Sequence, residues 1–179
     1  NRVANTAVLE MNDLAALFTH RIVTYTEDYA SHSSYTRRYM KKVKVIPPPV
    51  VLPEITAGQK QEFQQEHNPR GQHPVIGMAA RFATEKGVEV LLKAMPAVLE
   101  KHPQALFQFV GPFKNIMGEE QYFKKLESEI RKFEENGNWK FLGSMSPLEM
   151  SAFYANLDLL VVPSLNSTES FGLVQVEAM

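Results

Sequence analysis

The sequence predicts an α/β fold, in which a parallel sheet is covered by helices on both faces. From Pro74 onward, short apolar runs alternate with longer segments of helical periodicity. The apolar runs contain few polar residues, which is typical of strands buried on both faces of a parallel sheet. The strands are predicted over 75–80, 105–110, 139–142 and 159–162, and the helices over 86–101, 119–135, 146–156 and 171–179.

The predicted helices carry recognisable start and stop signals. The helix over 119–135 ends at Asn136-Gly137, a pair of residues that favours helix termination. Ser146, Pro147 and Glu149 form a capping-box sequence at the start of the next helix. The helix over 86–101 has one apolar face, made of Val88, Leu91, Leu92, Met95, Val98 and Leu99.

The first 49 residues predict a separate helix–strand–helix–strand piece. The helices are predicted over 4–19 and 28–40, and the strands over 22–25 and 43–46, the first of them buried. Three prolines at 47–49 end the second strand, because proline cannot donate a ladder hydrogen bond. Residues 50–74 contain further prolines and glycines and are predicted to be an interdomain linker, with a short surface helix over 59–67.

Composition indicates an ordinary globular protein. Hydrophobic residues make up 44% and charged residues 22%, and the net charge of −1 favours neither nucleic acid nor a membrane surface as partner. The chain has no cysteine, which excludes disulfides and thiolate chemistry and is compatible with a cytoplasmic location. No apolar run approaches the roughly 20 residues of a membrane span. The chain starts without Met and ends inside a predicted helix, so we expect a fragment.

Charge is uneven along the chain, with a basic cluster at 37–44 and an excess of four negative charges over 51–179. The cluster contains Arg37, Arg38, Lys41, Lys42 and Lys44. A solvated helix end, favoured by the helix dipole, is the simpler interpretation. A patch that faces acidic lipid at a membrane or an anionic acceptor is the competing one.

Several common catalytic motifs are missing from the sequence. It has no phosphate-binding GxxxxGK[ST] loop, no G-x-G-x-x-G dinucleotide motif and no G-x-S-x-G nucleophile elbow. The histidines show no metal-ligand spacing, so we expect no metal site.

Ligands of parallel α/β sheets bind outside the carboxyl ends of the strands. Four predicted loops lie there: 81–86, 111–118, 143–146 and 163–171. Arg81 and Lys86 in the first loop can grip a diphosphate, although an isolated Arg and Lys on a loop are more often just solvated charges. Gly111 and Gly143 are either simple turn glycines or points where the main chain approaches a ligand.

The last loop leads into a helix start between two acids. Glu169, Ser170, Phe171 and Gly172 precede an apolar segment that carries Glu177. Unpaired N–H groups at a helix start favour an anion, and carboxylates accept hydrogen bonds from hydroxyls. Together with Arg81 and Lys86 on the same edge of the sheet, this loop predicts a site for a phosphorylated sugar.

Four motifs in order resemble a known family. They are Gly77–Gly87, Phe109-Val110-Gly111, Phe141-Leu142-Gly143 and Pro163-Ser164 followed by Glu169-Ser170-Phe171-Gly172 and Glu177-Ala178-Met179. Together they resemble the retaining, nucleotide-sugar-dependent glycosyltransferases of the GT-B fold, family four. The resemblance implies that 75–179 is most of the Rossmann-like C-terminal donor domain, that 1–49 is the end of the N-terminal acceptor domain, and that 50–74 links them.

The resemblance also implies residue roles. Arg81 and Lys86 would neutralise the donor diphosphate, and Glu169 would bind hydroxyls of the transferred sugar. Ser170 and the backbone N–H groups of Phe171, Gly172 and Leu173 would lie against sugar and phosphate, with Gly111 and Gly143 nearby, and Glu177 would bind the ribose. No metal or other cofactor is expected, because the cations and the helix start supply the charge.

The partners implied are a nucleotide-sugar donor and an acceptor sugar, lipid or other glycoside. Peripheral membrane contact of the parent protein and self-association of the fragment remain open, and we expect this chain alone to be inactive. An epimerase or phosphorylase of the same fold is disfavoured by the Glu-Ser-Phe-Gly spacing. The sequence is also compatible with a non-catalytic nucleotide-sugar binding module and with an inert fragment of such an enzyme.

Overall fold

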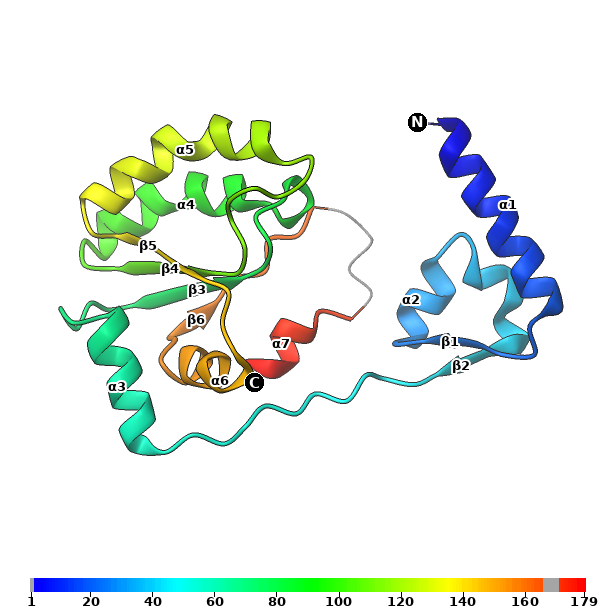
Figure 1. Ribbon diagram of the computed structural model, residues 1–179, viewed down its shortest axis with the longest axis horizontal. Coiled ribbons are helices and arrows are strands. Elements are labelled where there is room, and N and C mark those ends of the chain that lie inside the picture. Colours follow the sequence, from blue (N-terminus) through cyan, green and yellow to red (C-terminus); the bar gives the residue numbers. More distant parts are fainter. Residues whose placement is uncertain (1, 166–170) are drawn as a thin grey trace. The chain divides into compact units, whose positions relative to one another are not determined.

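The computed structural model describes residues 2–165 and 171–179 (Figure 1). Contacts divide the chain into two units, which are described separately. Unit 1 comprises the described residues up to 49 together with 171–172, and unit 2 comprises 50–165 and 173–179.

A four-stranded parallel sheet forms the centre of unit 2. Its strands are β3 (Val75–Ala79), β4 (Leu106–Val110), β5 (Trp139–Gly143) and β6 (Leu159–Leu160), in the order β5-β4-β3-β6. All pairs are parallel. The predicted parallel α/β fold is therefore confirmed, although β6 has two residues where four were predicted.

Helices cover both faces of this sheet (Figure 1). On one face, α4 (Val88–Lys101) and α5 (Glu120–Glu135) pack on the strand residues that alternate inward on that side. On the other, α3 (Ala57–His67) and α6 (Pro147–Ala155) form a smaller core. The larger core contains Ile76, Met78, Phe82, Val88, Leu91, Leu92, Met95, Phe107, Phe109, Leu126, Ile130 and Trp139.

Gly77 allows the smaller core to pack tightly against β3. A Cβ at this position would lie 2.4 Å from Leu157 Cδ1 and 2.7 Å from the ring of Phe153. A side chain here would therefore displace the ends of the Leu157 and Phe153 side chains from their packing against β3.

The helix α3 is an integral layer of unit 2, although it lies in the segment predicted as a linker. Phe63 is buried in the smaller core. Lys140 Nζ of β5 donates hydrogen bonds to the carbonyl oxygens of Glu66 (3.0 Å) and His67 (3.3 Å), at the end of the helix. The Gln108 amide nitrogen also donates to the His67 oxygen, at 3.3 Å. A cation and an amide thus satisfy carbonyls that the helix itself leaves unpaired.

Unit 1 contains a two-stranded parallel sheet and three helical segments. The elements are α1 (Arg2–Phe18), β1 (Ile22–Thr24), α2 (Glu27–His32), the 3₁₀ segment η1 (Thr36–Lys42) and β2 (Val43–Val45). The predicted strand is confirmed over Ile22–Thr24, but the prediction that it is buried is wrong, because Val23 is 56% and Tyr25 45% exposed. Exposed residues alternate with Thr24, which is buried, as expected when successive side chains point to opposite faces of a sheet.

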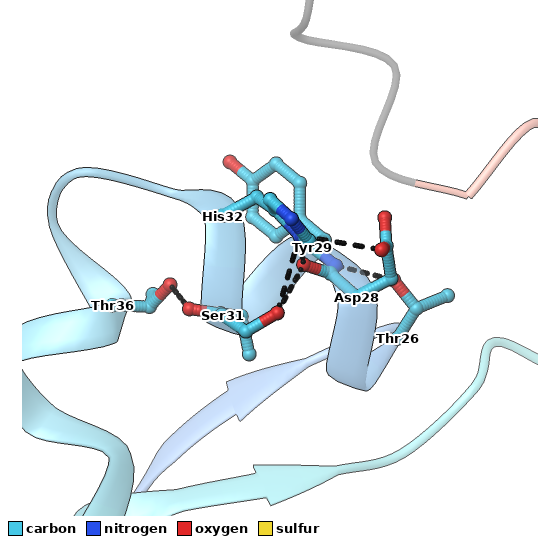
Figure 2. Close-up of polar contacts among 7 residues, drawn as sticks. Thr26, Asp28, Tyr29, Ser31, His32 and Thr36 are labelled. Atoms are coloured by element: carbon cyan, nitrogen blue, oxygen red, sulfur yellow. Dashed lines mark hydrogen bonds and ion pairs between the residues drawn. The ribbon is translucent and has the colours of Figure 1, made fainter.

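The single helix predicted over 28–40 is interrupted after His32 (Figure 2). The Thr26 hydroxyl caps the start of α2 by accepting from the Tyr29 N–H at 3.1 Å. At the other end, Ser33 is extended, and the Thr36 hydroxyl donates to the carbonyl of Ala30 at 2.7 Å. The Thr36 hydroxyl thus takes the Ala30 carbonyl, which in a continued helix would accept from the N–H of Ser34.

Two cations of the basic cluster are engaged with α1. Arg38 Nη2 pairs with Asp13 Oδ1 at 2.9 Å. Lys42 Nζ donates to the carbonyls of Ala16, Leu17 and Thr19 at 2.7, 3.1 and 3.1 Å. Arg38 and Lys42 are thus not simply solvated, because one pairs with an acid of α1 and the other binds carbonyls at the end of that helix. No helix within 2–165 or 171–179 is both long and apolar enough to cross a membrane.

Candidate functional site

The loops after the strands of unit 2 converge at the carboxyl edge of the sheet. The loop after β3, residues 80–87, lies at their centre. It contains a short 3₁₀ turn, η2 (Thr84–Lys86), followed by Gly87 in the left-handed conformation at φ +70°. The predicted helix start at Lys86 is therefore displaced: Lys86 ends the turn, and α4 begins at Val88 because Gly87 reverses the chain.

The two predicted cations both lie on this loop. Arg81 is exposed and forms an ion pair with Glu85, four residues along the chain. The pKa of Glu85 lies below its usual value because the carboxylate accepts from its own backbone N–H and from Arg81. Lys86, next to Glu85, is half-buried. Without a ligand, Glu85 thus offsets part of the positive charge that the sequence indicates for this loop.

The loop after β6 is fastened to the loop after β3. The Leu165 N–H donates to the Glu85 carbonyl oxygen at 2.9 Å. Gly87 lies directly against Pro163, since a Cβ on Gly87 would be 2.2 Å from the Pro163 carbonyl oxygen. The structure therefore brings residues 163–165 to the loop that carries Arg81 and Lys86.

The segment after β4 also contacts the loop after β3. Phe82 N–H donates to the Pro112 carbonyl at 2.9 Å. The Thr84 N–H and Oγ1 both donate to Glu119 Oε2, at 3.0 and 2.7 Å. Sequence reasoning missed Glu119, because a carboxylate at a helix start is ordinarily explained by the helix dipole alone.

The two predicted glycines have different surroundings. A Cβ on Gly111 would lie 2.0 Å from the Ala80 carbonyl oxygen, and its N–H donates to the Gly143 carbonyl at 2.8 Å. This geometry favours the turn interpretation of Gly111, which packs the ends of three strands. Gly143 has φ +74° and nothing within 4 Å of a Cβ, so its main chain is open to an approaching molecule.

The remaining predicted residues fall at the end of the chain. Glu169 and Ser170 lie outside the described residues. Phe171 and Gly172 group with unit 1. Their predicted roles, and those of Glu169 and Ser170, stay predictions.

Leu173 and Glu177 are the first and last residues of the five-residue helix α7. Glu177 Oε2 accepts a hydrogen bond of 2.7 Å from the Tyr154 hydroxyl of α6, so its carboxylate has a partner in the protein. That contact secures α7 to α6 within unit 2.

A concavity of about 270 Å³ lies at the opposite edge, where the strands begin. Asp158 Oδ2 accepts from the Val75 N–H at 2.6 Å and contacts His73 Nδ1 at 3.1 Å, which joins β3 to β6. His67 also lines it, and burial lowers the pKa of this imidazole. Asp158, His73 and the Val75 N–H pair with one another across the strands, which indicates a structural role for them.

In the described part of the chain, no group of three or more His, Cys, Asp or Glu side chains is arranged to hold a metal ion. Arg81 and Lys86 are the positive side chains of the loop after β3, and Lys114 is that of the loop after β4.

The family profile described as "Glycosyl transferases group 1" matches residues 59–179. Among curated proteins, a D-inositol 3-phosphate glycosyltransferase of Corynebacterium jeikeium is 30% identical over 141 residues, which cover 76% of this chain and 33% of the relative. A glycosyltransferase of Methanocaldococcus jannaschii is 28% identical over 121 residues, 68% of this chain and 28% of the relative. The chain thus spans about a third of the length of the curated relatives that it matches.

Solved structures show the same fold. Anabaena Alr3699/HepE, in complex with UDP and glucose, superposes with a TM-score of 0.76 at 23% identity and covers 95% of this chain and 45% of its own. The sucrose-phosphate synthase of Thermosynechococcus elongatus superposes with a TM-score of 0.71 at 23% identity, over 95% of this chain and 41% of its own.

Proposed function

Because the chain belongs to the group 1 glycosyltransferases, we propose that unit 2 binds the nucleotide-diphosphate sugar that the whole enzyme uses as its donor. The proposed reaction transfers the sugar to an acceptor with retention of anomeric configuration, as in family four. The acceptor is a sugar, a lipid or another glycoside. Relatives named for D-inositol 3-phosphate add a polyol phosphate to the acceptors worth testing.

One observation carries the proposal: residues 163–165 are fastened to the loop with Arg81 and Lys86 through the Leu165–Glu85 hydrogen bond. The segment that continues to Glu169 therefore starts beside the two cations. A diphosphate needs cationic or N–H donors on several oxygens, and a sugar needs acceptors for its hydroxyls. Because this segment starts next to Arg81, its position supports a single site that binds both the diphosphate and the sugar of one donor molecule.

The proposed chemistry relies on charge that grows on the leaving nucleotide. Arg81 as a planar fork and Lys86 as a point charge stabilise the diphosphate as the bond to the sugar breaks. Glu169 orients the transferred sugar, while Ser170 and the main chain at Phe171, Gly172 and Leu173 bind its hydroxyls and the phosphate. These cations perform the task that a bound metal ion performs in other transferases, so no metal is included in the proposal.

Glu177 is proposed to bind the ribose with the carboxylate oxygen that does not bond Tyr154. A carboxylate offers about four acceptor positions, so one hydrogen bond from Tyr154 leaves room for a ribose hydroxyl. In this arrangement Tyr154 orients the carboxylate of Glu177. The base of the nucleotide is proposed to bind main-chain groups of the turn at Gly143.

Titration calorimetry with UDP, GDP and ADP tests the proposal on the chain as it stands. Binding of one of these with clear preference over the other two is the expected result. No binding to any of them would contradict the proposal and favour an inert fragment. Binding without turnover by a longer protein that contains this chain would favour a non-catalytic binding module instead.

We also expect the isolated chain to show no sugar transfer, since it spans only about a third of its curated relatives. Release of the nucleotide from UDP-glucose, GDP-mannose and ADP-glucose, measured with and without a mixture of glycoside acceptors, checks this. Acceptor-dependent release by the 179-residue chain would show that the residues present suffice.

A further inference from the structure

A carboxylate from outside the loop that carries Arg81 and Lys86 is among the groups that hold it. Glu119 Oε2 accepts from the Thr84 N–H at 3.0 Å and from the Thr84 hydroxyl at 2.7 Å. We infer that Glu119 is a positioning residue, which fixes the turn Thr84–Lys86 in the orientation that a diphosphate requires. The inference rests on the proposed function, because it assigns Glu119 to the same site.

Glu119 is well placed to act as a fixed anchor. It immediately precedes α5. Its side chain does not cap the N-terminus of that helix by a hydrogen bond, although acids at helix starts often do. Its backbone is held on both sides, since its N–H donates to the Ile116 carbonyl at 2.9 Å and its carbonyl accepts from Phe123 at 3.0 Å. The carboxylate therefore extends from a rigid helix start to the Thr84 turn.

The start of the same loop is fixed independently by Phe82. This side chain is fully buried, and its ring lies 5.2 Å from that of Phe123 on α5. Its N–H donates to the Pro112 carbonyl. With Phe82 fixed by packing, the orientation of the next turn depends on the contacts of Thr84 together with the Leu165–Glu85 hydrogen bond, and Lys86 is two residues beyond Thr84.

Because Glu119 is negatively charged, repulsion of the diphosphate and positioning of the loop predict opposite effects of its removal on the binding affinity. A carboxylate near a diphosphate repels it, so removal of Glu119 should tighten binding if proximity is all that matters. If Glu119 positions the loop, its removal should weaken binding, because the cation and N–H groups no longer stay in place. The direction of the change therefore separates the two explanations.

The first experiment measures the affinity of the chain for UDP, GDP or ADP, whichever binds best, and for the matching nucleoside. We expect Glu119→Ala to weaken nucleoside-diphosphate binding about 5-fold, which corresponds to the loss of one or two hydrogen bonds, and to leave the nucleoside unaffected. Glu119→Gln should restore most of the affinity, because its amide oxygen still accepts from Thr84. Unchanged or tighter binding by Glu119→Ala would overturn the inference.

The second experiment combines the substitution with Lys86→Ala. If Glu119 acts through the loop cations, Glu119→Ala should have little further effect once Lys86 is absent. The same weakening in both backgrounds would show that Glu119 does not act through Lys86 and would overturn the inference.

Hydrogen exchange supplies a readout that needs no nucleotide. We expect Glu119→Ala to speed amide exchange in residues 82–87, and the exposed neighbour Glu120→Ala to leave it unchanged. Equal exchange in both variants would overturn the inference even if nucleotide binds. Failure of the unaltered chain to bind any of the three nucleotides would instead contradict the proposed function, and with it the role of Glu119 there.

Discussion

The Leu165 N–H donates a 2.9 Å hydrogen bond to the carbonyl oxygen of Glu85, whose side chain pairs with Arg81. Glu85 therefore has two partners: its main-chain carbonyl accepts a hydrogen bond from the loop after β6, and its carboxylate pairs with the guanidinium of Arg81. The two roles can be separated experimentally, because substitution of the side chain leaves the carbonyl in place.

Glu85→Gln should tighten binding of a nucleoside diphosphate about 2- to 5-fold. The substitution removes a negative charge that competes with the ligand for Arg81. An ion pair at the protein surface contributes at most about 1 kcal/mol, which limits the size of the effect. Calorimetry at two ionic strengths measures the change, which should shrink as salt screens the charges. Weaker binding would indicate that Glu85 orients Arg81 rather than competing for it.

Arg81→Ala and Lys86→Ala should each weaken nucleoside-diphosphate binding by roughly 1.5–3 kcal/mol, the usual worth of a hydrogen bond to a charged group. Lys93→Ala, on the exposed side of α4, is the matched control and should leave the affinity unchanged. An unchanged affinity in both site variants would remove this loop from the binding site.

Gly111→Ala should destabilise the chain far more than Gly143→Ala. Both glycines have positive φ, which costs a residue with a Cβ about 1–2 kcal/mol. Only at Gly111 would the Cβ also meet a carbonyl oxygen, that of Ala80, at 2.0 Å. Urea unfolding compares the two free energies, and equal losses would contradict the structural role assigned to Gly111.

The difference between these two glycines is one that sequence alone cannot resolve. Both follow a predicted strand in the same way, and which one meets the Ala80 carbonyl depends on the position of its neighbours in the sheet. The sheet itself, by contrast, is predictable because apolar runs and helix caps are local signals. Glu119 and the break after His32 are not, since each depends on a hydrogen bond from a threonine that the sequence does not reveal.

Stability should decrease as the pH rises above about 10, in part because of Tyr154. Burial and then the Glu177 carboxylate raise the pKa of Tyr154, so the folded chain keeps a proton that the unfolded chain loses. The free energy of unfolding therefore falls with pH in this range. Urea unfolding at pH 9 and pH 11 measures the slope, which Tyr154→Phe should reduce.

Tyr122 offers a second test of the same effect. Burial and a hydrogen bond to Glu89 raise the pKa of this hydroxyl as well, so Tyr122→Phe should also flatten the alkaline slope. If neither variant changes the slope, other groups cause the alkaline loss of stability.

The contact between Lys140 and the end of α3 provides a chemical reporter of how this helix docks. Burial lowers the pKa of Lys140, which on its own would make the amine more reactive towards acylating reagents. Its nitrogen, however, is occupied by the Glu66 and His67 carbonyls. Acylation at Lys140 therefore requires these hydrogen bonds to break, and its rate relative to that of Lys93 would report how often the end of α3 comes away from β5.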